Sequence, residues 1–255
     1  MCCFSRPVQS VSRTRIFCRF TEVDLQAVVY AMTIEAAEDL AMVLPLPVAP
    51  ARRQDAVTFV NLEGYPRFFD HLHNAFPQPK LQSLSFGGPP AAGNARTLKV
   101  EQVGSFEASY VPGIEDFARL DERFRLPAGT WEKLPRYADY GFAVFKLKPG
   151  KQKIHPMALT FRSRSPGTLF FPTVHIHDGK VHDREDFDHT LYAQGWTNAV
   201  ISGLDWEESP GAARGSIEID KTKGLVWADG HIYRRTITGT HKNEDILAKA
   251  RAMGG

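Results

Sequence analysis

Four histidines lie close together in the second half of the chain, in and after the stretch "FFPTVHIHDGKVH" of residues 170–182. His175 and His177 are two residues apart in a segment with the composition of a β-strand, and His182 and His189 follow. Successive side chains of a strand alternate between faces, so His175 and His177 are expected on one face, roughly 7 Å apart at Cα. That separation suits two ligands of one metal ion.

The residues after this pair can supply further ligands. A turn at Asp178-Gly179 would bring His182 back beside the pair, and His189 or a nearby carboxylate would complete three or four ligands. Nitrogen ligands favour zinc or copper over magnesium or calcium. In the alternative interpretation the histidines are polar residues of a half-exposed strand, hydrogen-bonded to the acidic residues of "HDREDFDH". Both interpretations stay open.

The amino terminus offers a second candidate site. The chain begins Met-Cys-Cys, and methionine is usually removed when the second residue is small, which would leave Cys2 with a free amine and a thiol. The amine, with a pKa of ~7.7–8, can act as base for the thiol of its own residue. Amine and thiolate can instead bind a metal ion. Cys2 is therefore a candidate nucleophile, a candidate ligand beside the histidines, or a terminus without chemistry.

The spacing of apolar residues predicts more strands than helices. Strands are expected near 14–20, 26–34 and 38–44 and again through the 141–177 region, with short helices after Pro66 and over 114–124. The segment "NEDILAKARAM" predicts a C-terminal helix over 243–253, with Asn243 as cap and acidic residues in its first turn. Because the helices do not alternate with the strands, the expected fold class is α+β, with mainly antiparallel sheet units and a few short helices.

Length and charge limit the function classes. A chain of 255 residues suits one domain over 1–255, which can also be divided into two packed sheet units, 1–112 and 139–240, joined by a helical stretch. With 31 basic and 29 acidic residues, no nucleic-acid partner is expected. No apolar run reaches the ~18 residues of a membrane span, and the basic first twenty residues have no secretory core, so a cytoplasmic protein is expected.

Several stretches of the sequence resemble two known families, each over part of the chain. "CCFSRPVQSVSRTRIFCRF", "AEDLAMVLPLPV" and "GFAVFKLKPG…HPMALTF…LFFPTV" resemble the bacterial family called domain of unknown function 2330, over about half of the chain. That resemblance implies no activity; its members usually look secreted, with a cysteine near the mature start, whereas this chain shows no signal segment. The opening "MC…IFCR…E" resembles the choloylglycine-hydrolase group of N-terminal-nucleophile enzymes, which implies Cys2 as nucleophile and Arg19 as its electrostatic support.

Three functions are compatible with these features. The first is a metal-binding protein or metalloenzyme that uses His175 and His177 with His182, His189 or Cys2. The second is an amide hydrolase built on Cys2 and Arg19; either enzyme would take a small-molecule substrate. The third is a non-catalytic interaction module that receives a protein partner at the prolines of "LPLPVAP" or at an exposed edge strand.

Overall fold

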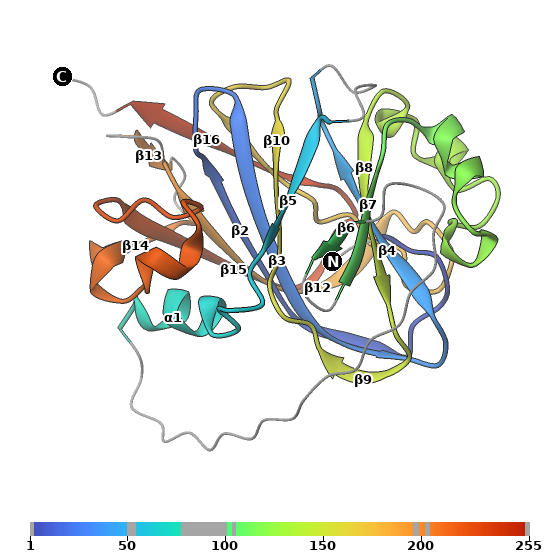
Figure 1. Cartoon of the computed structure of the whole chain (residues 1–255), viewed down its shortest axis with the longest axis horizontal. Coiled ribbons are helices and arrows are strands. Elements are labelled where there is room, and N and C mark those ends of the chain that lie inside the picture. The colour runs from blue at the N-terminus through green and yellow to red at the C-terminus, as the bar shows by residue number, and fades with distance from the viewer. Residues whose placement is uncertain are drawn as a thin grey trace.

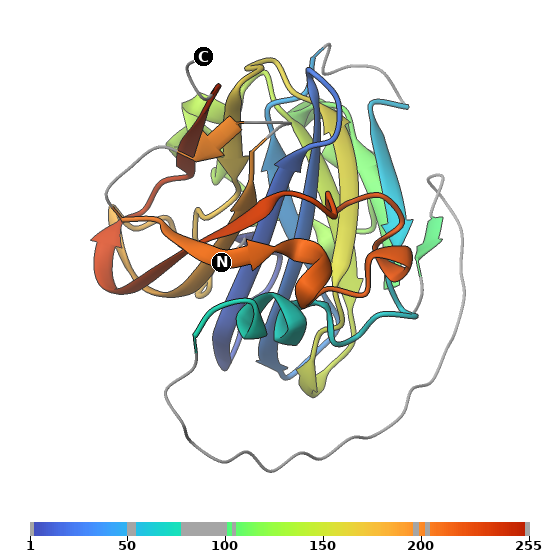
Figure 2. The same cartoon turned by 90° about the vertical axis from the view of Figure 1, so that its left-hand side faces the viewer.

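Two large β-sheets pack face to face, and a small third sheet lies beside them (Figures 1 and 2). The computed structural model describes residues 3–49, 55–77, 101–103, 106–195, 199–201 and 205–252. Within these residues the larger sheet has eight strands, in the order β14-β15-β12-β2-β3-β10-β5 with β9 paired to β3. Its strands are β2 (Ser10–Phe20), β3 (Leu25–Ala36), β5 (Val57–Asn61), β9 (Gly150–Lys153), β10 (Met157–Arg162), β12 (Arg184–Gln194), β14 (Glu207–Ala212) and β15 (His231–Lys242).

The two other sheets are smaller. The second sheet has the order β1-β4-β8-β7-β6 in the described residues, with β1 (Cys3–Phe4), β4 (Leu40–Leu46), β6 (Glu101–Val103), β7 (Phe106–Val111) and β8 (Gly141–Leu147). The third has the order β11-β16-β13, with β11 (Thr168–Phe171), β13 (Ala199–Ile201) and β16 (Ile246–Ala252). Paired strands are antiparallel except β12 and β2, which run parallel with His189 opposite Thr14.

Helices are short. The described α-helix is α1 (Phe68–Asn74), which begins soon after Pro66 as the sequence predicts. The 3-10 helices are η1 (Ile114–Arg119), η2 (Glu122–Phe124), η3 (Trp131–Lys133), η4 (Pro135–Tyr137), η5 (Ala213–Gly215) and η6 (Ile219–Thr222). None of the helices in the described part of the chain combines the length and the apolar character of a membrane-spanning segment.

Strand β3 lies at the centre of three layers, which explains its nearly continuous apolar sequence. Val28 and Tyr30 face the second sheet, where Met42 and Phe145 belong to the same core cluster. The opposite face of β3 packs against α1 and the segment of η5 and η6, as the arrangement in Figure 1 shows. A strand buried on both faces needs apolar side chains at successive positions rather than at alternate ones.

The prediction of an α+β fold with a C-terminal helix over 243–253 is wrong, because the fold is mostly β and this segment forms strand β16. Strand β16 pairs with β11 on one side and β13 on the other. Leu247 is exposed and Ala248 is buried, which is the alternation of a strand. Asn243, the expected cap, and Asp245, an acidic residue expected in the first turn, bond instead to the backbone of another segment. The predicted helix over 114–124 is replaced by the 3-10 helices η1 and η2.

The two large sheets do not correspond to the two halves of the chain, residues 1–112 and 139–240. Each of them contains strands from residues 1–112 and strands from residues 139–240. The helical stretch expected between these ranges corresponds to η1–η4, which connect β7 to β8 inside the second sheet.

Gln26 holds the small sheet against the large one. Its side-chain Nε2 donates to the carbonyl oxygen of Phe170 at 2.7 Å, and its Oε1 accepts from the backbone nitrogen of Phe170 at 3.0 Å. The side-chain amide thus makes the two hydrogen bonds to Phe170 that a neighbouring strand would otherwise make to β11. Gln26 is fully buried. The Sγ of Cys18 donates to the same carbonyl at 3.4 Å, so this cysteine is a packed core residue.

We expect Gln26→Leu to destabilise the fold by about 2–4 kcal/mol. The substitution removes both hydrogen bonds of the side-chain amide and leaves the backbone N–H and C=O of Phe170 buried without these partners. Denaturant unfolding followed by circular dichroism measures the change. Gln9→Leu is the matched control, because Gln9 is exposed and the same substitution there should change stability by less than about 0.5 kcal/mol. Equal stability of the two variants would contradict the role given to Gln26.

Candidate functional site

The segment that carries His175 and His177 is extended but is not a regular strand. Residues 173–177, called here the 173–177 segment, follow β11 and make a single parallel bridge, between Ile176 and Cys3. The backbone nitrogen of Phe4 donates to the carbonyl of Ile176 at 3.0 Å, and that of Val8 donates to the carbonyl of His177 at 2.9 Å. The first described residues of the chain therefore run beside this segment.

Two side chains from the residues before β16 bond the other side of the 173–177 segment. Asn243 accepts from the backbone nitrogen of His175 at 2.7 Å and donates to the carbonyls of His175 and His182, both at 2.9 Å. Asp245 accepts from the backbone nitrogens of Thr173 and Val174 at 2.9 and 3.1 Å. The segment thus has its hydrogen bonds supplied by side chains in place of a partner strand.

Asp245 is also bonded to the helical connection. The hydroxyl of Tyr137 donates to Oδ2 of Asp245 at 2.5 Å, and Arg136 donates to the carbonyl of Asn243 at 3.0 Å. Burial raises the pKa of the Asp245 carboxyl, against the lowering effect of the hydrogen bonds that it accepts from Tyr137, Val174 and Thr173. One acidic side chain therefore joins the 173–177 segment to η4.

The rings of His175, His177 and His189, called here the histidine stack, lie nearly parallel. The ring centroid of His175 is 5.1 Å from that of His177, with 13° between the ring planes, and 5.1 Å from that of His189, with 10°. The Nε2 atoms of His175 and His189 are 3.4 Å apart. Two distant segments thus bring their imidazoles together, and His175 and His177 lie near each other as strand spacing predicts.

Aromatic residues enclose the histidine stack. Phe187, two residues before His189 on β12, has its ring centroid 4.4 Å from that of His175 and 4.8 Å from that of His189. Phe4 of β1 packs against His177, with 5.7 Å between the ring centroids. His175 and His189 are almost entirely buried.

This burial keeps the rings neutral at neutral pH. Loss of solvation lowers the pKa of His177 to about 4 and lowers the pKa of His175 and His189 further. A neutral imidazole has one ring nitrogen with a lone pair, which can accept a hydrogen bond or bind a metal ion. Within the described residues, however, no three or more His, Cys, Asp and Glu side chains are already arranged to hold an ion.

The other predicted site residues lie elsewhere. His182 is exposed and its Nε2 bonds Oδ2 of Asp178 at 3.0 Å, so its ring is engaged at the turn. Arg19 lies opposite Gln194 on β12, five residues along β2 from Thr14, which faces His189. That offset corresponds to roughly 16 Å along a strand. Burial lowers the pKa of Arg19 to about 10, and its guanidinium donates to the carbonyl of Gly224 at 3.3 Å.

Cys2 lies outside the described residues, so its roles as nucleophile and as ligand stay predictions. The neighbouring Cys3 is buried in β1. Of the prolines proposed as a partner site, Pro45 and Pro47 are buried at β4, which pairs with β1 and β8, and Pro50 lies outside the described residues. A partner therefore has no access to "LPLP" in this fold.

Sequence reasoning missed three residues of the site: Phe187, Asn243 and Asp245. Phe187 has a signal in the sequence, because "Phe-Asp-His" places it two residues from His189 and hence on the same strand face. Asn243 and Asp245 have none that is specific, because an Asn followed by acidic residues is also the usual start of a helix.

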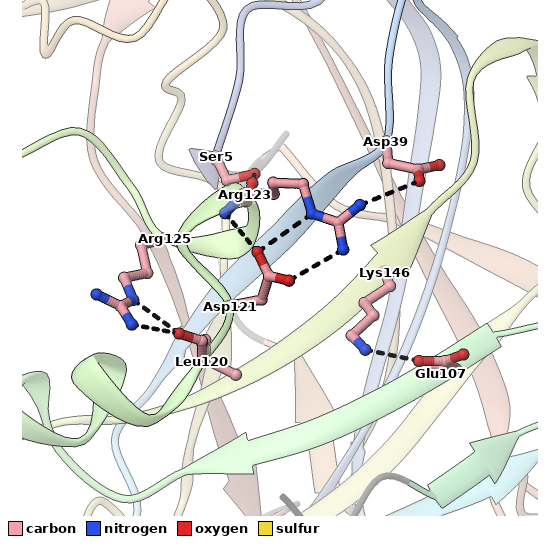
Figure 3. Close-up of polar contacts among 8 residues, drawn as sticks. All are labelled: Ser5, Asp39, Glu107, Leu120, Asp121, Arg123, Arg125 and Lys146. Atoms are coloured by element: carbon pink, nitrogen blue, oxygen red, sulfur yellow. Dashed lines mark hydrogen bonds and ion pairs between the residues drawn. The ribbon is translucent and has the colours of Figure 1, made fainter. Parts of the chain in front are cut away.

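A second group of polar contacts fixes the first residues of the chain to the connection between β7 and β8, and Figure 3 shows it. The hydroxyl of Ser5 donates to the carbonyl of Arg123 at 2.8 Å and accepts from the backbone nitrogen of Ala41 at 2.9 Å. Ser5 therefore links η2 to strand β4. The chain is held on both sides of β1, by this serine and by the 173–177 segment.

Charged side chains surround η2 in the same view (Figure 3). The guanidinium of Arg123 pairs with Asp121 at 2.9 Å and approaches Asp39 at 3.9 Å. Its hydrogen bonds lower the pKa of the Asp121 carboxyl to about 2. Lys146 of β8 pairs with Glu107 at 2.7 Å, and its Nζ lies 4.9 Å from the ring centroid of Phe124. The contact of Lys146 with Phe124 thus binds η2 to the second sheet.

Comparison with known proteins identifies the fold only. No family model matches the chain, and no curated protein matches it. The crystal structure of baculovirus P35 has a TM-score of 0.51 at 12% identity, over 99% of this chain and 100% of that one. The caspase-8/P35 complex gives 0.48 at 11% identity over 94% and 96%, and a mutated baculovirus P35 after caspase cleavage gives 0.49 at 12% over 94% and 100%.

We expect the protein to lose stability as the pH falls from 6.5 to 4. The unfolded chain takes up protons on its histidines near pH 6.5, whereas the folded pKa of His177 is about 4, so acid favours the unfolded state. His177 alone should lower the free energy of unfolding by about 3 kcal/mol at pH 4. Urea unfolding at several pH values measures this.

His177→Gln should make the stability of the protein depend less steeply on pH, because it removes an imidazole whose pKa is lowered in the folded state. His182→Gln is the matched control: its ring is exposed, and the substitution should leave the loss below pH 6.5 in place. A wild-type stability that is unchanged between pH 6.5 and 4 would contradict a neutral, buried histidine stack.

We expect Asn243→Asp to destabilise the protein by about 2–4 kcal/mol, because a carboxylate keeps the acceptor but faces the carbonyls of His175 and His182 without a proton to donate. Asn61→Asp is the control, because the exposed Asn61 uses its oxygen to accept from Glu63 and aspartate keeps that bond. Thermal unfolding compares the two variants. Equal melting temperatures would show that Asn243 does not hold the 173–177 segment.

Proposed function

We propose that this chain is a non-catalytic binding protein whose partner is a protease of the caspase class. The single observation that carries the proposal is the similarity of fold to baculovirus P35 along the whole length of both chains. P35 itself has been seen in a complex with caspase-8 and after cleavage by a caspase. The proposal extends to this chain the kind of partner that P35 has.

The rigidity of the scaffold supports a binding role. The connection from β7 to β8 runs through η1–η4 without a regular α-helix or strand, and connections of such length are commonly functional. Three contacts with distant parts of the chain fix it: Ser5 bonds the carbonyl of Arg123, the Arg123 guanidinium approaches Asp39, and Asp245 bonds Tyr137. A segment held in place before binding loses less entropy when a partner is bound.

The edges of the large sheet differ in what they offer a partner. Strand β14, at one edge, carries Glu207, Glu208 and Pro210, and charges and proline are the usual means by which an edge avoids pairing with another strand. Strand β5, at the other edge, contains Thr58, Phe59 and Val60 and no charged residue. If a partner adds a strand to this sheet, β5 is the edge whose composition permits it.

The test is inhibition and complex formation with purified caspases. The folded chain, in excess over caspase-8 and two further caspases with different peptide preferences, should lower the hydrolysis of a peptide substrate at least tenfold for one of them. The same pair should elute together in size-exclusion chromatography. Intact-mass measurement of the chain shows whether the caspase cleaves it.

Two controls separate binding from other effects. A caspase with its catalytic cysteine alkylated tests whether association requires cleavage. The Gln26→Leu and Gln9→Leu variants, compared at a temperature that unfolds only the former, test whether the folded chain is needed. Unchanged peptide hydrolysis with every caspase, together with separate elution at about 50 µM chain, a concentration that would show even weak association, would contradict the proposal.

A further inference from the structure

Two nitrogen atoms of the histidine stack lie at a distance that suits a long hydrogen bond and also a shared metal ion. The Nε2 atoms of His175 and His189 are 3.4 Å apart, and one neutral ring can donate to the other there. Two nitrogens bound at 2.0–2.1 Å to one tetrahedral zinc ion lie about 3.3–3.4 Å apart. The pair therefore has the separation of two ligands of one metal ion.

Two further ring nitrogens of the stack are buried without a hydrogen-bond partner among the described residues. They are Nδ1 of His175 and Nε2 of His177. Most buried polar atoms in proteins are hydrogen-bonded, and an exception calls for a ligand, a water molecule or an ion. Nδ1 of His175 points away from the ion that Nε2 of the same ring would bind, whereas Nε2 of His177 belongs to the neighbouring ring, with 5.1 Å between the ring centroids.

We propose that the histidine stack binds one transition-metal ion, zinc or copper, through Nε2 of His175, His177 and His189. His175 and His189 have a separation that such an ion accommodates, and His177 would become the third ligand after a rotation of its ring. Imidazole nitrogen suits zinc and copper and does not suit magnesium or calcium. Copper in its monovalent state brings less charge into the buried site, which lowers the cost of burial.

The surrounding residues hold the ligands in place for such an ion. Asn243 bonds both backbone groups of His175, and the parallel pairing of β12 with β2 fixes His189 opposite Thr14. Phe187 packs against both rings. Groups that orient the ligands of a metal site contribute strongly to its affinity. The site joins the 173–177 segment to β12, so the bound ion should stabilise the fold. This inference does not depend on the proposed partner.

The experiment uses the full chain without a histidine tag, stripped with a chelator and then given one equivalent of Zn²⁺ or of Cu⁺ under reducing conditions. After desalting, elemental analysis should find about one ion per chain for at least one of the two metals. The melting temperature should rise by about 5 °C in excess metal, as expected for an ion that binds only the folded state.

The variant His175→Phe/His189→Phe should retain less than about a tenth of the bound metal, and added metal should no longer raise its melting temperature. Phenylalanine is chosen because Phe187 already packs against these rings. His177→Gln, at a partly exposed position, should weaken binding at least tenfold and serves as the test if the double variant does not fold. His182→Phe is the matched control and should bind metal as the wild type does. Less than about 0.1 ion per wild-type chain for both metals, or equal loss in His182→Phe, would overturn the proposal.

Discussion

The side chains of Asn243 and Asp245 make the hydrogen bonds that a neighbouring strand would otherwise make to the 173–177 segment, and the arrangement of the site depends on these bonds. A buried backbone must find hydrogen-bond partners, and here two side chains supply them from the residues just before β16. Because Asn243 fixes the backbone of His175 on both its nitrogen and its oxygen, the ring of His175 is directed toward His189. The same residues lead into β16 and, through Asp245, contact Tyr137, so the small sheet, the helical connection and the histidine stack share one anchor.

The first residues of the chain complete this arrangement from the opposite side. Phe4 bonds the carbonyl of Ile176 and packs against His177, while Ser5 joins η2 to β4. The 173–177 segment therefore lies between side chains of the C-terminal region and backbone of the N-terminal region. Chain ends usually contribute little to a fold, but here both ends of the described chain contribute bonds to the same five residues.

The sequence predicted what depends on local spacing and missed what depends on distant partners. The near placement of His175 and His177 follows from the two-residue period of an extended chain, and α1 follows from apolar spacing after Pro66. The segment "ILAKARA" is rich in good helix formers, yet strands on both sides of β16 outweigh that local preference. Asn243 has the same local sequence context as a helix cap. Its bonds to the backbone of His175 depend on where the fold places His175, which the local sequence does not reveal. His182 was expected beside the pair, but Asp178 engages its ring within the turn.

The fold and the histidine stack are independent properties of this chain. A fold similarity at 12% identity concerns the path of the backbone, whereas the stack depends on which side chains occupy three positions of two segments. Function is carried by such sites rather than by folds. The protease-binding proposal therefore depends on surfaces that the scaffold presents, and replacing His175 and His189 with residues that keep the core packed would leave those surfaces in place. Conversely, an ion held by these rings would join the 173–177 segment to β12 whether or not any partner binds. Such an ion would add a bond between the 173–177 segment and β12, beside the bonds of Asn243 to the backbone of His175 and to that of His182, two residues before β12.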